Sequence, residues 1–166
     1  MRRWSRRFSL GLAGLAAVLG VAVPAGGQMI GDPEVHRTLD AFHQAASDAD
    51  FDAYMGLFAE DGVFLGTDAT ERWSVDEFAE YVAAAFDRGR GWTYRPVARW
   101  VSVSGDGSTA WFDERLENDS YGDTRGTGVL VLTADGWKVA QYNLTIPIPN
   151  ALAREFVARI REGGGE

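Results

Sequence analysis

The spacing of apolar residues changes after residues 88–92 ("RGRGW"), and this change restricts the folds open to the chain. Before the break apolar residues recur at helical spacing; after it they alternate with polar ones, as in half-buried strands. Four such segments follow in succession, separated by short turns, at residues 92–103, 109–118, 123–133 and 137–146. Consecutive strands with short turns pair antiparallel, so we predict a four-stranded meander.

Three helices are expected before the meander. Asp32 is placed to cap the first, Asp50 precedes the second, and Ser74–Glu77 ("SVDE") reads as a capping box that opens the third. A short strand is expected at residues 62–66, and Asn150 caps a final amphipathic helix. A curved meander needs helices over its concave face. The order therefore favours an α+β fold with N-terminal helices packed on a curved antiparallel sheet.

The first 25 residues have the features of an export signal. Arginines precede an apolar run at residues 8–23, and small residues at Val23 and Ala25 suit cleavage after Ala25. The stretch "SRRFSL" partly resembles a twin-arginine signal, which leaves the export route open, and an uncleaved anchor is the alternative. We expect a periplasmic or extracellular protein divided into a signal peptide (1–25), a linker (26–32), one domain (33–162) and a flexible tail (163–166).

Charge and cysteine content restrict the partners and the kinds of site. The net charge is −8, and removal of the arginine-rich first 25 residues makes it more negative. Nucleic acids and, after signal cleavage, anionic membranes are therefore not expected as partners; neutral or cationic molecules are favoured. The chain has no cysteine, which excludes disulfides, thiolate metal sites and cysteine nucleophiles. We find no dinucleotide or phosphate-binding motif and expect no cofactor.

Four stretches resemble a known family. They are "FHQAASDADFDAYMGLFAEDGVFLGTDATERW" (42–73), "WFDE" (111–114), "RGTGVL" (125–130) and "WKVAQYNLTIPIPN" (137–150). In sequence and order they are similar to the SnoaL-like domains of the nuclear transport factor 2-like superfamily. The resemblance implies a cone-shaped fold. It implies little about function, because the superfamily contains isomerases, cyclases, dehydratases, hydrolases and non-enzymatic binding proteins.

The last hairpin predicts a cavity. A two-residue turn at Asp135–Gly136 would place Leu130 opposite Gln141 and Gly128 opposite Asn143. Because glycines remove side-chain volume, this face of the sheet would end in a space bordered by two amides, which we expect to contact a ligand. Alternatively, the glycines only let the sheet bend, and Gln141 and Asn143 lie at a solvated rim.

Glu114 is the candidate catalytic residue. In "WFDERLE" (111–117) it shares the apolar face of the strand with Phe112, and pairing with Gly126 would place it in the cavity. A desolvated carboxylate has a raised pKa and can act as a general acid or base. A shift of one residue would instead pair Glu114 with Arg125 in a structural ion pair.

The preceding hairpin predicts the walls of this cavity. A five-residue turn would set Arg99 opposite Asp113 and Arg95 opposite Glu117, so that opposite charges meet on the outer face of the sheet. The inner face beside Glu114 would then be aromatic, with the side chains of Trp92, Tyr94 and Trp100.

Four further residues are candidates for ligand contact. His43 lies on the first helix, which lines the pocket in many members of the superfamily, and Tyr54 is a possible hydrogen-bond donor. Asp68 and Trp73 lie in a loop that is near the mouth of the cone in SnoaL-like domains; alternatively, this loop is only a turn at a helix entry. The spacing of His36 and His43 is too wide for a chelating pair, so no metal site is expected.

We therefore expect an exported protein that binds a small, largely apolar molecule in a conical pocket. The first alternative is a cofactor-free enzyme of isomerase, cyclase or hydrolase type that uses Glu114 as general acid or base. The second alternative is a dimeric assembly or interaction module without turnover.

A homodimer through the outer face of the sheet is also expected. The predicted register gives this face an apolar patch made of Val129, Val131, Ala140, Tyr142 and Leu144. Such a patch is too large to be left in water. A two-fold dimer would bury it, and the alternative cover is the final helix, whose apolar side carries Leu152, Phe156, Val157 and Ile160.

Overall fold

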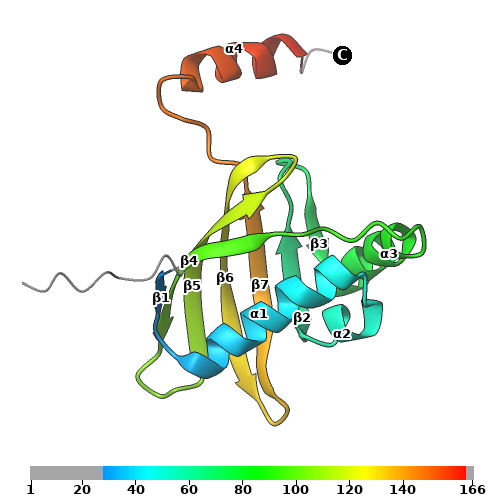
Figure 1. Ribbon diagram of the computed structural model, residues 1–166, viewed down its shortest axis with the longest axis vertical. Helices are drawn as coiled ribbons and strands as arrows, with labels where there is room; N and C mark the ends of the chain where they lie inside the picture. The colour runs from blue at the N-terminus through cyan, green and yellow to red at the C-terminus, as the bar shows by residue number, and fades with distance from the viewer. Residues whose placement is uncertain (1–27, 164–166) are drawn as a thin grey trace, which may run out of the picture.

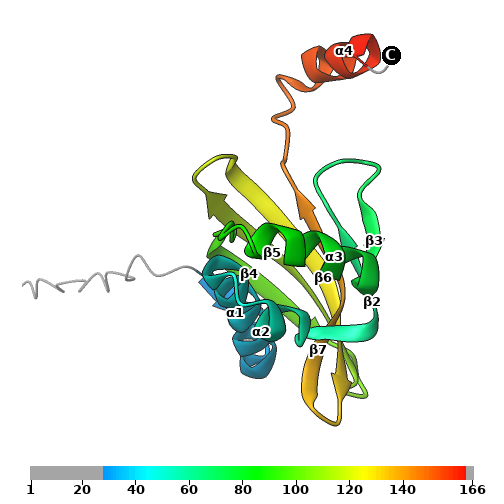
Figure 2. The same ribbon diagram turned by 90° about the vertical axis from the view of Figure 1, so that its right-hand side faces the viewer.

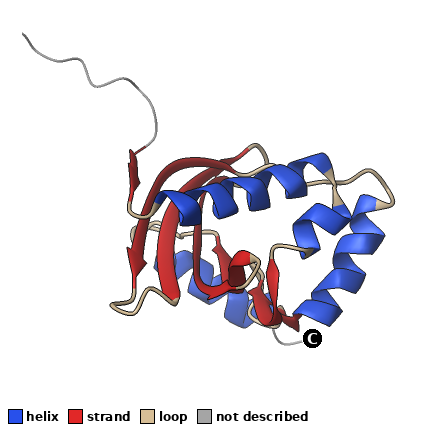
Figure 3. Ribbon diagram, turned by 90° about the horizontal axis from the view of Figure 1, so that it is seen from below, coloured by secondary structure: helices blue, strands red, loops and turns tan. Residues whose placement is uncertain are grey.

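The computed structural model describes residues 28–163. Within them a seven-stranded sheet has the order β1-β4-β5-β6-β7-β2-β3, and it curves around the helices on its concave side (Figures 1 and 3). The strands are β1 (Gln28–Ile30), β2 (Phe58–Leu65), β3 (Arg72–Ser74), β4 (Arg95–Val103), β5 (Thr109–Asn118), β6 (Gly122–Thr133) and β7 (Gly136–Thr145). The helices are α1 (Pro33–Asp48), α2 (Phe51–Met55), α3 (Val75–Phe86) and α4 (Ala153–Gly163). The α+β fold and the β4–β7 meander expected from the sequence are confirmed.

The predictions for the two ends of the chain are covered only in part by the described residues. The expected signal peptide (1–25) and residues 164–166 of the expected tail lie outside the described residues. Residues 28–30, expected to belong to a linker, form β1 and pair in parallel with β4. Residue 163, expected in the tail, is the last residue of α4.

The three N-terminal helices start at the capping residues predicted from the sequence. The Asp32 carboxylate accepts hydrogen bonds from the backbone at the start of α1, and Asp50 does the same for α2. Ser74 and Glu77 form a reciprocal capping box at the start of α3. These helices lie side by side over the sheet (Figure 2), and their apolar faces supply about half of the core, the inner face of the sheet supplying the rest. In its centre the Phe42 ring lies 4.6 Å from the Tyr54 ring and 4.9 Å from that of Tyr142, between ring centroids.

The register of β6 and β7 differs from the prediction. The turn lies at residues 134–135, one residue earlier than expected, which moves the pairing by two residues. A bulge at Ala140 then moves the pairing back by one residue. Gly128 therefore pairs with Tyr142 rather than Asn143. Tyr142 is buried, whereas Gln141 is exposed. The inward position predicted for Gln141 and Asn143 is wrong, and so is the outward position predicted for Tyr142 and Leu144.

A bulge also alters the hairpin of β4 and β5. Its turn is one residue shorter than expected, so Arg99 pairs with Glu114 and Trp100 pairs with Asp113. Trp100 is thus on the outer face, not the inner one, and Arg99 points inward. The bulge at Val97 then restores the predicted pairing of Arg95 with Glu117.

The last helix, α4, stands apart from the body of the molecule (Figures 1 and 2). None of its residues is buried, and the side chains of Phe156, Val157 and Ile160 are exposed. It therefore does not cover the outer face of the sheet. No helix among residues 28–163 has the length and apolarity needed to cross a membrane.

Candidate functional site

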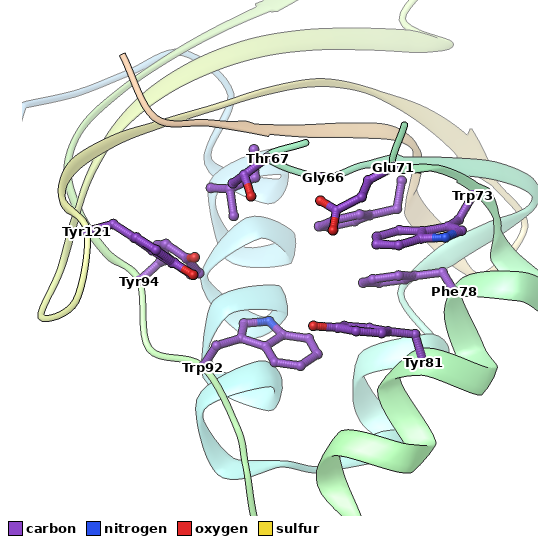
Figure 4. Close-up of a pocket in the computed structure, with 11 residues that line it drawn as sticks. Gly66, Thr67, Glu71, Trp73, Phe78, Tyr81, Trp92, Tyr94 and Tyr121 are labelled. Atoms are coloured by element: carbon purple, nitrogen blue, oxygen red, sulfur yellow. The ribbon is translucent and has the colours of Figure 1, made fainter. Parts of the chain in front are cut away.

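An open pocket with a volume of about 230 Å³ lies where α3, β3 and the segment before β4 come together (Figure 4). We call it the mouth pocket. Aromatic side chains from five parts of the chain line it: Phe64 on β2, Trp73 on β3, Phe78 and Tyr81 on α3, Trp92 and Tyr94 before β4, and Tyr121 in the β5–β6 turn. Gly66, Thr67, Glu71 and Leu144 complete the lining.

One wall of the mouth pocket is a set of nearly parallel rings. The Trp73 ring lies 5.3 Å from Tyr81 at an interplanar angle of 17°, and 5.7 Å from Phe78 at 22°. Offset parallel packing of this kind holds aromatic rings in fixed positions. Tyr81 and Tyr121 are 53% and 54% exposed, so the pocket is reached directly from solvent.

Glu71 supplies the charge of the mouth pocket. It lies between β2 and β3, and its carboxylate accepts a hydrogen bond of 3.0 Å from the backbone N–H of Asp68. Figure 4 shows the carboxylate turned toward the space that the rings surround. Asp68 itself does not line the pocket; it accepts hydrogen bonds from Thr70, and these lower the pKa of its carboxyl. Asp68 thus stabilises a turn, which was the alternative interpretation of this loop, and is not part of the pocket lining.

A second group of polar residues lies deep in the cone. We call it the buried polar cluster: Arg99, Glu114, His43 and Tyr142. The Arg99 Nε donates to Glu114 Oε2 at 2.7 Å, and the Tyr142 hydroxyl donates to Oε1 at 2.9 Å. The His43 Nε2 lies 2.8 Å from the same Oε1 and must donate, because an ionised carboxylate only accepts.

The buried polar cluster is joined to helix α1. The Arg99 Nη1 donates to the Asp40 carboxylate at 2.8 Å and to the His36 carbonyl at 3.2 Å. Arg99 and Glu114 are both fully buried, whereas the Asp40 side chain is 61% exposed. Arg99 therefore connects a buried carboxylate on β5 to the solvent-facing edge of α1.

Glu114 has the position predicted from the sequence but not the predicted pKa. It lies inside the cone opposite Gly126, beside Phe112. Burial raises the pKa of its carboxyl, but His43 and Arg99 outweigh this through charge and hydrogen bonding and lower the pKa to about 2. The raised pKa was expected for an unpaired Glu114; the carboxylate is instead paired with arginine, although with Arg99 and not with Arg125, and it is ionised at neutral pH.

Glycine at position 126 makes room for this arrangement. A Cβ atom there would lie 2.6 Å from Glu114 Oε1 and would also clash with the Tyr142 hydroxyl. The space that the missing side chain leaves is filled by the Glu114 carboxylate and the Tyr142 phenol.

Little empty space separates the two groups of residues. A void of only about 10 Å³ lies between Tyr94, Trp92 and Leu144, which also line the mouth pocket, and His43 and Tyr142 of the buried polar cluster. A separate side cavity of about 260 Å³ borders His43 and Tyr94 from the other direction. Tyr94 therefore lines all three spaces and separates them.

The residues proposed as ligand contacts from the sequence fall into three places. Tyr94 and Trp73 line the mouth pocket. His43 and Tyr54 border the small void, and Phe112 packs beside Tyr142 with 5.9 Å between ring centroids. The remaining residues, Trp100, Gln141, Asn143 and Asp68, line none of these spaces.

Several pocket residues were not identified from the sequence. Tyr81 was not among the predicted ligand contacts, although a half-exposed tyrosine on this helix suits a pocket wall. Arg99 and Glu71 gave no local signal, because their positions depend on a bulge and on a loop conformation. Among residues 28–163 there is no group of three or more His, Asp or Glu side chains arranged to hold a metal ion.

The replacement of Glu114 by glutamine tests the role of the buried polar cluster. The change removes the buried partner of the Arg99 charge and leaves only the largely exposed Asp40 as its counter-ion. We therefore expect the free energy of unfolding to fall by roughly 3 kcal/mol. Glu117→Gln, on the exposed face of the same strand, should change it by less than about 0.5 kcal/mol. Urea unfolding of both variants at pH 7 measures the difference; equal stabilities would contradict a supporting role for the ion pair.

The low pKa of Glu114 predicts that the free energy of unfolding depends on pH, and the same variant tests this. Because the folded pKa of Glu114 lies below its unfolded value of 4.5, its ionisation stabilises the fold above that pH. This contribution, about 3 kcal/mol, is lost as the pH falls from about 4.5 to 2. The stability difference between the wild type and Glu114→Gln should therefore shrink over this range, and a constant difference would argue against it.

The family comparison agrees with this architecture. The model of the SnoaL-like domain family matches residues 35–149. A comparison with curated proteins finds no significant match.

Solved structures of low sequence identity share the fold. An NTF2-like protein of unknown function from Pseudomonas putida is 13% identical with a TM-score of 0.59, covering 70% of this chain and 87% of its own. A candidate ketosteroid isomerase from Shewanella frigidimarina is 18% identical, with a TM-score of 0.57 and coverages of 71% and 99%. A candidate dehydratase of the NTF2-like family from Streptomyces avermitilis is 20% identical, with a TM-score of 0.58 and coverages of 70% and 95%. These identities establish the fold only, but with the family match they lead to one conclusion: the chain belongs to the SnoaL-like domain family.

Proposed function

We propose that the protein binds a small, largely apolar organic molecule in the mouth pocket. The observation that carries the proposal is an open space of about 230 Å³ with aromatic side chains on most of its lining. Ligand pockets are mostly apolar and contain a few polar groups that orient the ligand, and Glu71 and Thr67 are placed to do so here. The volume suits a compound of one or two rings, not a long chain.

The rings of the mouth pocket are held before any ligand arrives. Phe78 is buried, and its ring lies 4.0 Å from that of Phe64 at an angle of 7°. Side chains already fixed by packing lose little conformational entropy on binding, so their apolar area contributes more fully to affinity. This favours binding at the mouth over binding at the small void near Tyr142.

A neutral aromatic probe, 2-naphthol, tests the proposal. We expect saturable binding that shifts the NMR signals of the Trp73 and Trp92 indole N–H groups. Tyr81→Ala removes one ring and should weaken binding by roughly threefold to tenfold, whereas Tyr81→Phe keeps the ring and should leave it nearly unchanged. If the probe shifts neither indole signal, the mouth pocket is not a binding site for such ligands.

A catalytic function is a second candidate, and the contact of His43 with Glu114 favours it. Both oxygens of Glu114 are occupied by hydrogen bonds, which leaves this carboxylate poorly placed to transfer a proton. His43 borders the side cavity and the small void, and a carboxylate behind a histidine fixes its orientation. The role of proton-transfer group thus suits His43 better than Glu114. Recovery of a bound ligand chemically unchanged after long incubation would count against turnover.

We also propose that the protein is exported. The support is the basic and apolar pattern of residues 1–25, which lie outside the described residues. Mass spectrometry of the protein recovered from its host should show a mature N-terminus near Gly26. Recovery of the uncleaved chain from the cytoplasm or the membrane would contradict this.

Association of two copies through the outer face of the sheet is a further proposal. The pairing of β5 with β6 puts Trp111 on that face, 51% exposed, beside Val129 and with Val131 further along β6. A two-fold contact would bury these side chains against their own counterparts. Trp111→Glu should convert a dimer to a monomer in light scattering, and Trp111→Phe should not. An unchanged mass for wild type and Trp111→Glu, both monomeric, would exclude the dimer.

A further inference from the structure

The lining of the mouth pocket has an acidic side chain and no basic one. Glu71 is the single ionised side chain in its lining, and no lysine, arginine or histidine lines it. A carboxylate in an aromatic pocket is a cost to the binding of a neutral apolar molecule, because the ligand displaces the water that solvates the charge. The cost is removed when the ligand carries a positive charge of its own.

Three tyrosine hydroxyl groups add hydrogen-bonding oxygens to the pocket lining. Tyr81, Tyr94 and Tyr121 all line the pocket, and Figure 4 shows Tyr94 and Tyr121 on the side opposite Tyr81. Burial first, and then the proximity of Tyr121 and Tyr81, raises the pKa of the Tyr94 hydroxyl to about 12. The pocket thus resists further negative charge, while its hydroxyl oxygens remain available as acceptors to a cation.

We propose that the mouth pocket selects an organic ammonium cation, with its alkyl groups against the rings and its charge near Glu71. The inference rests on the proposed function, since it names the ligand class for the same site. Aromatic rings attract cations as well as apolar groups, and an alkylammonium ion presents both to the pocket. A carboxylate is the complementary partner, and its charge strengthens a hydrogen bond or an ion contact.

The conformation of the loop favours this role for Glu71. The hydrogen bond from the Asp68 backbone engages Oε2, which leaves Oε1 for a ligand. The position of the side chain depends on Gly66, because a Cβ atom at residue 66 would collide with the Glu71 side chain. The carboxylate is therefore held at the pocket by the shape of the β2–β3 loop and not by a basic partner.

A matched pair of probes tests the inference on the full chain. Choline and 3,3-dimethylbutan-1-ol have nearly the same shape, and only choline is charged. We expect choline to bind more tightly by about tenfold at low salt, followed through the indole N–H signals of Trp73 and Trp92. Glu71→Gln should abolish this preference, because it removes the charge and keeps the shape of the side chain. Glu80→Gln, an exposed change on α3 outside the pocket lining, should preserve it.

The outcomes separate this inference from the proposed function. Equal affinity for the two probes would overturn the cation preference and leave the pocket as a binding site. A preference for choline that persists in Glu71→Gln would overturn the role of that carboxylate and with it the inference. If neither probe binds, the cation preference is overturned, and the experiment with 2-naphthol decides whether the pocket binds ligands at all.

Discussion

The ion pair of Arg99 and Glu114 is the interaction on which the interior of the cone depends. Both side chains are fully buried, on the adjacent strands β4 and β5, and the pair is joined to α1 through Asp40. Two charges placed in a protein interior lose much hydration energy, which is regained only through close pairing and further hydrogen bonds to the charged groups. His43 and Tyr142 supply two of these partners. Polar contacts therefore join the helices to the sheet, in addition to apolar packing.

This cluster also determines where a ligand has room. The deep end of the cone is occupied by Glu114, Tyr142 and the surrounding core, and the void left there is about 10 Å³. Open volumes lie at the mouth, where aromatic rings from separate elements surround Glu71 (about 230 Å³), and in the side cavity next to His43 (about 260 Å³). Glu114 deep in the cone and Glu71 at the mouth thus have different surroundings. The first is buried and paired with arginine, and the second is open to solvent and lacks a basic neighbour in the pocket lining.

Local patterns in the sequence predicted much of this fold. Alternation along β5 placed Glu114 inside, and the capping residues Asp32, Asp50 and Ser74 marked the starts of the helices. These features depend on neighbouring residues only, which is why they can be derived from one chain.

The bulges and the pocket walls could not be derived in the same way. A shift of one residue in the pairing reverses which side chains face inward. Such a shift, at the β4–β5 turn for Arg99 and at the bulge at Ala140 for Tyr142, led to both residues being predicted on the wrong side of the sheet. Pro96, next to the bulge at Val97, was a usable signal, because proline inside a sheet is largely confined to edges and bulges. The mouth pocket had no comparable signal: Trp73, Tyr81 and Trp92 meet only when three separate elements pack together.

The central claim is that Glu114 is an ionised, arginine-paired carboxylate that supports the cone. Its titration by ¹³C NMR, with the Glu114 side-chain carboxyl assigned by comparison with Glu114→Gln, tests that claim most directly. The account predicts a carboxyl chemical shift that stays at the ionised value from pH 7 down to about pH 3, in agreement with a pKa lowered to about 2. A titration midpoint above the ordinary value of 4.5 would contradict it, since it would identify a desolvated carboxyl free to exchange a proton near neutral pH.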